Sequence, residues 1–175
     1  MVGLGPFLVS NPIRVRFAPA PRAHRGKLGL HGTFGIEIHA ATFVRRRLMV
    51  LDEELIHQPR ELERIVIHEM FHFVWPKLGN GARRSWEELL RSELQRRARG
   101  ELGWSAESRK RQLAAVDARR RTRRWREYAC ESFCDSAAWL LGEADGHREF
   151  TLAQRHRVAR RRWFEQTLSD SPISI

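Results

Sequence analysis

The hydrophobic pattern of this chain changes its period near Pro59, and this change constrains the fold more than any other feature. Apolar residues alternate with arginines over 13–17, which predicts a half-buried strand. Two further strands are predicted over 33–39 and 43–51. Because these strands lie close together in sequence, we expect a small antiparallel or mixed sheet in the N-terminal part.

After Pro59 the apolar residues recur at helical spacing, and this pattern continues through the C-terminal half. Ser85 begins a sequence that matches a capping box and predicts the start of a helix. The segment 105–141 contains no Gly or Pro, which indicates one very long helix or two helices with a break near 119–122. The remaining predicted helices cover 60–75, 85 to about 100, and 151–168.

The length of 175 residues fits one domain, and we expect a single domain over 1–175. Within it, 82–126 has 15 basic and 6 acidic residues, a balance of +9 out of a net charge of +11. This segment is predicted to be an inserted basic helical hairpin. Its charge indicates either weak contact with nucleic acid or another polyanion, or simply solvated helix faces.

The sequence also limits where the protein works. The uncharged stretch 1–13 contains two prolines and has no basic start, which argues against a membrane span and a cleaved signal peptide. The only cysteines are Cys130 and Cys134, too few for a disulfide framework. We therefore expect a cytoplasmic protein without a membrane partner, in which both cysteines pack as small buried residues.

The most specific pattern is H-E-x-x-H, formed by His68, Glu69 and His72 inside the predicted helix 60–75. Residues four apart lie on one helix face, so both imidazoles can bind one metal ion. The glutamate after the first histidine can hold the attacking water. Roughly 0.03 such patterns are expected by chance in a chain of this composition. The pattern therefore predicts a catalytic zinc site.

A catalytic zinc ion takes three protein ligands, so a third is needed besides the two histidines. The segment 127–141 places Glu127, Glu131 and Asp135 in one row if it is helical. Glu127 has arginines on the preceding turn, whereas Glu131 and Asp135 have no basic residue three or four positions away. Buried carboxylates need a partner, and a metal ion is one such partner. This favours Glu131 over Glu127 as the third ligand, with both kept as candidates.

The combination of H-E-x-x-H with a later E-x-x-x-D helix resembles the gluzincin branch of the zincin metallopeptidases. The short length is similar to that of the minigluzincins. The resemblance covers 60–75 and 127–141, about a fifth of the chain. It implies that Glu131 is the third zinc ligand and that Asp135 orients His68 by a hydrogen bond.

This resemblance implies an α+β, zincin-like fold, with a small N-terminal sheet packed on the active-site helix and a helical C-terminal half. The expected function is a zinc-dependent metallopeptidase that hydrolyses a peptide or protein substrate, with Glu69 as general base. In zincins the substrate adds to a sheet edge, and 43–51 is the expected edge here. Tyr128 is a candidate donor to the oxyanion.

Two other functions remain open on the sequence. The chain could be a zincin-like domain that binds or regulates without cleaving, or a basic nucleic-acid-binding protein without peptidase activity. The presence of Glu69 favours the peptidase, because a structural metal site has no use for a general base.

Overall fold

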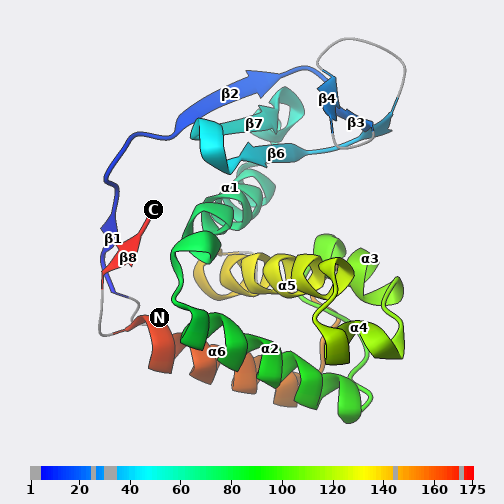
Figure 1. Ribbon diagram of the computed structural model, residues 1–175. Coiled ribbons are helices and arrows are strands. Elements are labelled where there is room, and N and C mark those ends of the chain that lie inside the picture. The colour runs from blue at the N-terminus through cyan, green and yellow to red at the C-terminus, as the bar shows by residue number, and fades with distance from the viewer. Residues whose placement is uncertain (1–4, 25–26, 30–34, 144–145, 170–171) are drawn as a thin grey trace.

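The computed structural model describes residues 5–24, 27–29, 35–143, 146–169 and 172–175 of the chain. Short strands dominate the N-terminal part and six helices follow within these residues, which confirms the α+β prediction. In Figure 1 the sheet lies at one end of the molecule and helix α1 leads from it into the helical part. None of the described helices is long and apolar enough to cross a membrane.

The sheet nearest α1 has three strands in the order β2-β7-β6. Strand β2 (Arg14–Ala18) pairs in parallel with β7 (Leu48–Asp52), and β6 (Ala40–Phe43) pairs antiparallel with β7. A mixed sheet was expected and is observed. Its outer strand β6 contacts α1 and is free on its other side among the described residues.

The prediction of a single strand over 43–51 was wrong. The 3₁₀ turn Val44–Arg46 interrupts it and Arg47 adopts a left-handed φ of 50°, so the chain reverses and forms a β6–β7 hairpin. This makes β7 the central strand and β6 one of the two outer strands, the other being β2. A bulky residue rarely adopts this φ, and no glycine marks the turn in the sequence.

The other strands are short. Strand β3 (Arg22–His24) pairs antiparallel with β4 (Lys27–Gly29) and β5 (Ile36–Glu37), while β1 (Phe7–Leu8) pairs in parallel with β8 (Ile173–Ser174). Of the strand predicted over 33–39, only Ile36–Glu37 is extended and paired, and 33–34 lie outside the described residues.

The helical part is built around α5 (Arg123–Leu141), which crosses α1 (Pro59–Val74) and lies between it and the remaining helices (Figure 1). Helix α1 begins with Pro59 in its first turn, where the missing N–H is tolerated. Thr122 caps α5 by accepting a hydrogen bond from the Trp125 backbone. The other helices are α2 (Asn80–Gln95), α3 (Trp104–Arg111), α4 (Ala115–Arg120) and α6 (Gln154–Leu168).

The expected break near 119–122 is confirmed, because Arg121 adopts a left-handed φ of 49° between α4 and α5. A second break between α3 and α4 was not predicted. The capping box at Ser85 was wrong: α2 starts at Asn80, and the Ser85 hydroxyl donates to the carbonyl of Ala82 one turn earlier.

The basic segment 82–126 contains most of α2, then α3, α4 and the start of α5, rather than a two-helix hairpin. It contributes Trp86 and Leu90 to the main core. Several of its arginines pair with acids: Arg121, for example, contacts both carboxylate oxygens of Glu87 at 2.7 Å. Contact between this segment and a polyanion stays a prediction.

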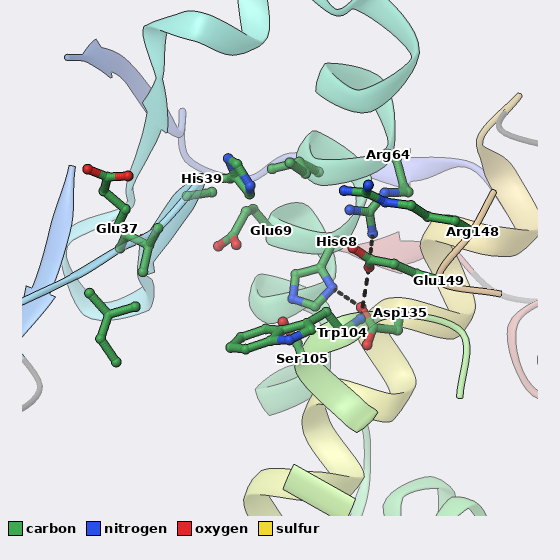
Figure 2. A pocket seen from close by; sticks show the side chains of 14 residues that line it. Glu37, His39, Arg64, His68, Glu69, Trp104, Ser105, Asp135, Arg148 and Glu149 are labelled. Carbon is green, nitrogen blue, oxygen red and sulfur yellow. Dashed lines mark hydrogen bonds and ion pairs between the residues drawn. The ribbon is translucent and has the colours of Figure 1, made fainter. Parts of the chain in front are cut away.

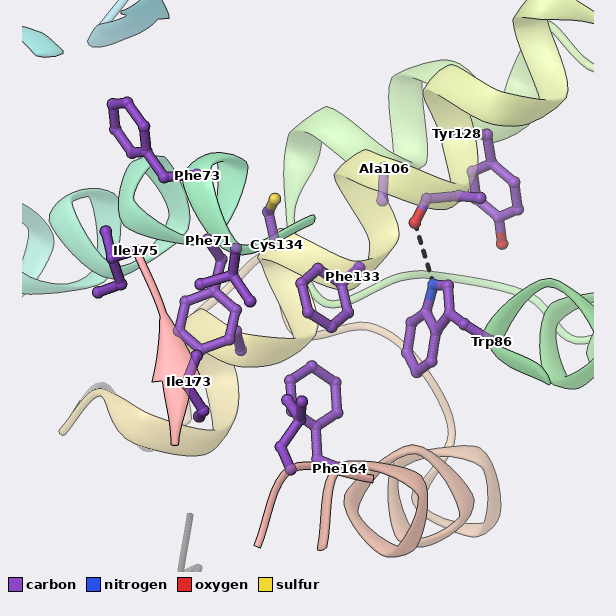
Figure 3. Close-up of a cluster of buried hydrophobic side chains, with 14 of the residues drawn as sticks. Phe71, Phe73, Trp86, Ala106, Tyr128, Phe133, Cys134, Phe164, Ile173 and Ile175 are labelled. Carbon is purple, nitrogen blue, oxygen red and sulfur yellow. Dashed lines mark hydrogen bonds between the residues drawn. The ribbon is translucent and has the colours of Figure 1, made fainter. Parts of the chain in front are cut away.

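The main core is aromatic and centres on Phe133 of α5 (Figure 3). Its ring stacks on Phe164 of α6 with centroids 5.1 Å apart and contacts Trp86 of α2 at 5.9 Å. The Trp86 indole N–H donates to the carbonyl of Ala129. These contacts fix α2 and α6 against α5 at the point where α5 also packs on α1.

A buried ionic cluster joins the same helices. The Arg160 guanidinium of α6 is fully buried and donates to both carboxylate oxygens of Glu93 and to Glu101. Lys110 and the Tyr128 hydroxyl also contact Glu101, at 3.0 and 2.6 Å. Although burial raises the pKa of the Glu101 carboxyl, the charges of Arg160 and Lys110 hold it below its usual range. The cluster is thus buried but internally paired.

Arg160→Ala should lower the free energy of unfolding by about 3–5 kcal/mol, because it leaves buried carboxylates without their cation. The matched control is Arg162→Ala, since Arg162 lies two residues away on an exposed face of the same helix. This control should change stability by no more than about 0.5 kcal/mol. Denaturant unfolding followed by circular dichroism measures both, and equal effects would contradict the role of Arg160.

Candidate metal centre and active site

Helix α1 presents His68 and His72 to α5, where both imidazoles lie beside Glu131. The Nε2 atoms of the two histidines are 3.2 Å apart. The Glu131 Oε2 atom lies 3.3 Å from Nε2 of His68 and 3.7 Å from Nε2 of His72. Residues separated by about sixty positions in sequence therefore bring three possible ligand atoms to one point.

These spacings can be compared with those of a tetrahedral metal site. With zinc–nitrogen and zinc–oxygen bonds of about 2.0–2.2 Å, neighbouring ligand atoms are separated by about 3.3–3.6 Å. The observed distances of 3.2, 3.3 and 3.7 Å lie close to this range. The cluster has the dimensions of a three-ligand site without further movement.

Asp135 fixes the orientation of His68. Its Oδ1 atom lies 2.7 Å from Nδ1 of His68, and its Oδ2 atom accepts a hydrogen bond from the Ala106 backbone in α3. With Nδ1 held in this way, Nε2 of His68 lies 3.3 Å from Oε2 of Glu131 and 3.2 Å from Nε2 of His72. This is the placement that the sequence analysis expected for Asp135.

Gly103, just before α3, is needed for this arrangement and was not recognised from the sequence. A Cβ atom at this position would lie 2.3 Å from the Asp135 carboxylate. The neighbouring Trp104 backbone N–H donates to Glu149, which holds the start of α3 in place. A single glycine thus allows α3 to approach Asp135 closely enough to donate through Ala106.

The other nitrogen of His72 faces the two thiols. The Sγ atoms of Cys130 and Cys134 each lie 3.6 Å from Nδ1 of His72. His68, His72 and Cys134 each offer a ligand atom, and these atoms lie within 4.8 Å of one another, so they form a possible metal-binding group. Cys134 also belongs to the core, as the sequence analysis expected. The sequence analysis did not predict the contact between Cys134 and His72. The signal for it was the position of Cys130 and Cys134 on the same helix as Glu131, within one turn of it.

The charges of this cluster shift its titration. Burial raises the pKa of the Glu131 carboxyl, but the hydrogen bond with His68 and the charge of His72 outweigh it and bring the pKa to about 2. Burial lowers the pKa of His72, but the Cys130 thiol and the Glu131 carboxylate raise it to about 9. The hydrogen bond with Cys134 lowers the pKa of the Cys130 thiol to about 6. In the metal-free protein, Glu131 is therefore ionised and His72 protonated at neutral pH.

Glu127, the alternative third ligand, is held elsewhere. Its carboxylate contacts Arg123 at 2.7 Å and Arg109 at 3.2 Å. Arg109 of α3 also approaches Oε1 of Glu131 at 3.9 Å, which supplies the counter-charge that the Glu131 helix itself lacks. The geometry favours Glu131 over Glu127 as a ligand.

Tyr128 is not placed to act on a substrate, and this expectation was wrong. Its side chain is fully buried, and its hydroxyl donates to Glu101 in the ionic cluster of Arg160. The hydroxyl is thus held among Glu101, Lys110 and Arg160 in the interior rather than at the cavity beside His68.

Glu69 lies beside the cluster on α1 and lines a cavity of about 420 Å³ together with His68 (Figure 2). The Glu69 side chain is mostly buried, and its carboxylate has no ion pair or hydrogen bond among the described residues. The Thr42 hydroxyl of β6 donates to its backbone carbonyl, at 3.3 Å. The cavity therefore lies between the sheet edge and the start of α3, with an unpaired carboxylate at its wall.

Comparison with known proteins adds no assignment. No family model, no curated protein and no solved structure matches this chain. The chemistry of the site has to be argued from its own residues.

We expect Glu131→Ala to weaken zinc binding strongly, because it removes one of three ligands and leaves two histidines. The matched control is Glu127→Ala, one turn away on the same helix, which should leave the zinc affinity nearly unchanged. Competition with a chromogenic chelator measures both dissociation constants. If Glu127→Ala lost zinc affinity and Glu131→Ala kept it, Glu127 would be the third ligand instead.

Zinc affinity should rise as the pH increases from 6 toward 9. A protonated imidazole cannot bind the metal, and the pKa of His72 is raised to about 9, so the proton competes more strongly at lower pH. Each pH unit below this value should weaken binding by up to about tenfold for each proton displaced. Calorimetry in buffers of different ionisation enthalpy counts the protons released when zinc binds. Release of no protons at pH 7 would refute the competition between zinc and the proton on His72.

Proposed function

We propose that this protein is a zinc-dependent metallopeptidase in which His68, His72 and Glu131 hold the metal and Glu69 is the general base. The observation that carries the proposal is the set of three ligand atoms at tetrahedral spacing, next to an unpaired carboxylate that lines a cavity. Asp135 supports it by orienting His68 through a short hydrogen bond. This arrangement is similar to that of the gluzincins.

The choice of zinc follows from the donor set. Two neutral imidazoles and one carboxylate match the ligands of catalytic zinc sites, which leave a fourth position to water. When bound, zinc lowers the pKa of a water molecule and polarises a carbonyl oxygen. Glu69 is next to a ligand in sequence but faces the cavity, so its carboxylate can accept a proton from the attacking water and pass it to the leaving amine.

The surroundings of the cavity suit an extended peptide. Strand β6 is the outer strand of the β2-β7-β6 sheet that contacts α1, and the hydroxyl of its Thr42 donates to the Glu69 backbone carbonyl. An extended substrate can pair with such an edge through its backbone. Ile36 and Trp104 both line the cavity, and at 74% and 67% they are the most exposed large apolar side chains among the described residues. Exposed apolar side chains of this kind are typical of binding surfaces.

Glu69→Gln should retain zinc and lose peptide hydrolysis by at least about 100-fold, because the amide keeps the shape of the side chain and removes its basicity. Metal content by elemental analysis and cleavage of a mixed peptide library are measured on the same preparation. His72→Ala is the control that should lose both metal and hydrolysis. Full hydrolysis by Glu69→Gln would exclude Glu69 as the base, and a zinc-loaded wild type that cleaves nothing would favour a binding or regulatory role.

A further inference from the structure

The active-site cavity adjoins a second cavity of about 720 Å³ beside the start of α1. His39 and Arg148 line both cavities, so they stand where the two meet. The second cavity is bordered by further basic side chains, Arg60 and His147, and by a single acid, Glu61. A peptide bound next to Glu69 can therefore extend into a basic compartment.

The acids that line the two cavities are largely neutralised by partners. Glu61 pairs with Arg64 and His147, and Glu149 pairs with Arg64. The remaining acids behave in the same way: Glu37 pairs with Arg22 and Asp135 with His68. Among the described residues, Glu69 is the only acid on these walls without a partner.

The two arginines at the junction are not neutralised, whereas the His39 imidazole lies within electrostatic reach of the Glu61 carboxylate. Arg148 and Arg60 are exposed, and neither has an acid partner among the described residues. The His39 side chain is exposed too and makes no hydrogen bond within the same part of the chain. Two free guanidinium groups and an imidazole thus face a volume large enough for a side chain, and a carboxylate is the peptide group that complements them.

The sheet edge indicates how far this junction lies from the reacting bond. Thr42 of β6 contacts the Glu69 backbone, and His39 precedes it by three residues. An extended chain rises about 3.3 Å per residue, so a substrate paired with β6 covers about 10 Å between these two points. The side chain that reaches His39 and Arg148 is about three residues from the scissile bond.

We infer that the substrates of this site are acidic peptide segments, with an Asp or Glu side chain bound at the junction of the two cavities by Arg148 and His39. The inference rests on the proposed peptidase function and adds the substrate class to it. Arg148 here determines specificity and takes no part in the chemistry. Because the groups are exposed, the preference is electrostatic and weakens as salt screens it.

The test uses pairs of fluorogenic peptides that differ only in Asp or Lys at each position up to three residues on either side of the scissile bond. The wild type should cleave the acidic member of at least one pair about tenfold better in kcat/KM at 20 mM salt, and less selectively at 500 mM. Arg148→Glu should abolish or reverse that ratio. The matched control Arg162→Glu, an exposed arginine on α6 outside both cavities, should leave it unchanged.

Cleavage of both members at equal rates by the wild type, or an unchanged ratio in Arg148→Glu, would overturn the inference. Failure of the peptidase proposal is recognised separately, because no peptide is then cleaved. In that case the same labelled pairs are titrated by fluorescence anisotropy against zinc-loaded Glu69→Gln protein. Tighter binding of the acidic peptide that is lost in Glu69→Gln/Arg148→Glu supports the inference, and equal binding refutes it.

Discussion

The packing of α1 on α5 around the His68–Asp135 hydrogen bond determines the rest of the structure. A carboxylate as buried as Asp135 is stable only when donors satisfy it, and here the donors come from α1 and α3. The bond joins residues 67 positions apart, so it fixes the helix that presents both histidines against the helix that presents Glu131. Without it, His68 could rotate and its Nε2 atom would leave the cluster.

The helices on the far side of α5 hold that arrangement in place. Phe133 and Asp135 are two residues apart and therefore lie on different faces of α5. Phe133 packs on Phe164 of α6, and Arg160 of the same helix pairs with Glu93 of α2. A rigid α5 keeps Glu131 at ligand distance from two imidazoles, and this is the precision that a metal site requires.

Local periodicity predicted those parts of the site that depend on one helix at a time. The spacing of His68 and His72 and the row of Glu131 and Asp135 follow from 3.6 residues per turn. Contacts between elements were not predictable in this way. The Arg160–Arg162 run is typical of solvated charge, yet Arg160 is fully buried because Glu93 and Glu101 face it from distant segments.

The turns show a second limit. Arg47 and Arg121 both take left-handed conformations that the sequence normally marks with Gly or Asn. At Arg121 the reason is tertiary, because its side chain is held by two contacts to Glu87. The position of the edge strand beside the candidate site was therefore predicted wrongly from the sequence, while the helix pair that forms the cluster was predicted correctly.

His72 has two different environments, and this decides which of its nitrogens serves the proposed chemistry. Its Nδ1 atom faces Cys130 and Cys134, of which Cys134 is fully buried in the core. An ion on that side would have thiolate ligands and would be enclosed by α5, as in a structural site. Its Nε2 atom faces Glu131 and the Nε2 atom of His68, and His68 also borders the cavity with Glu69. Of the two positions, only the one on the Nε2 side is next to both the unpaired Glu69 carboxylate and the cavity that could hold a substrate. The two thiols are therefore better suited to orient His72 than to bind the proposed catalytic metal.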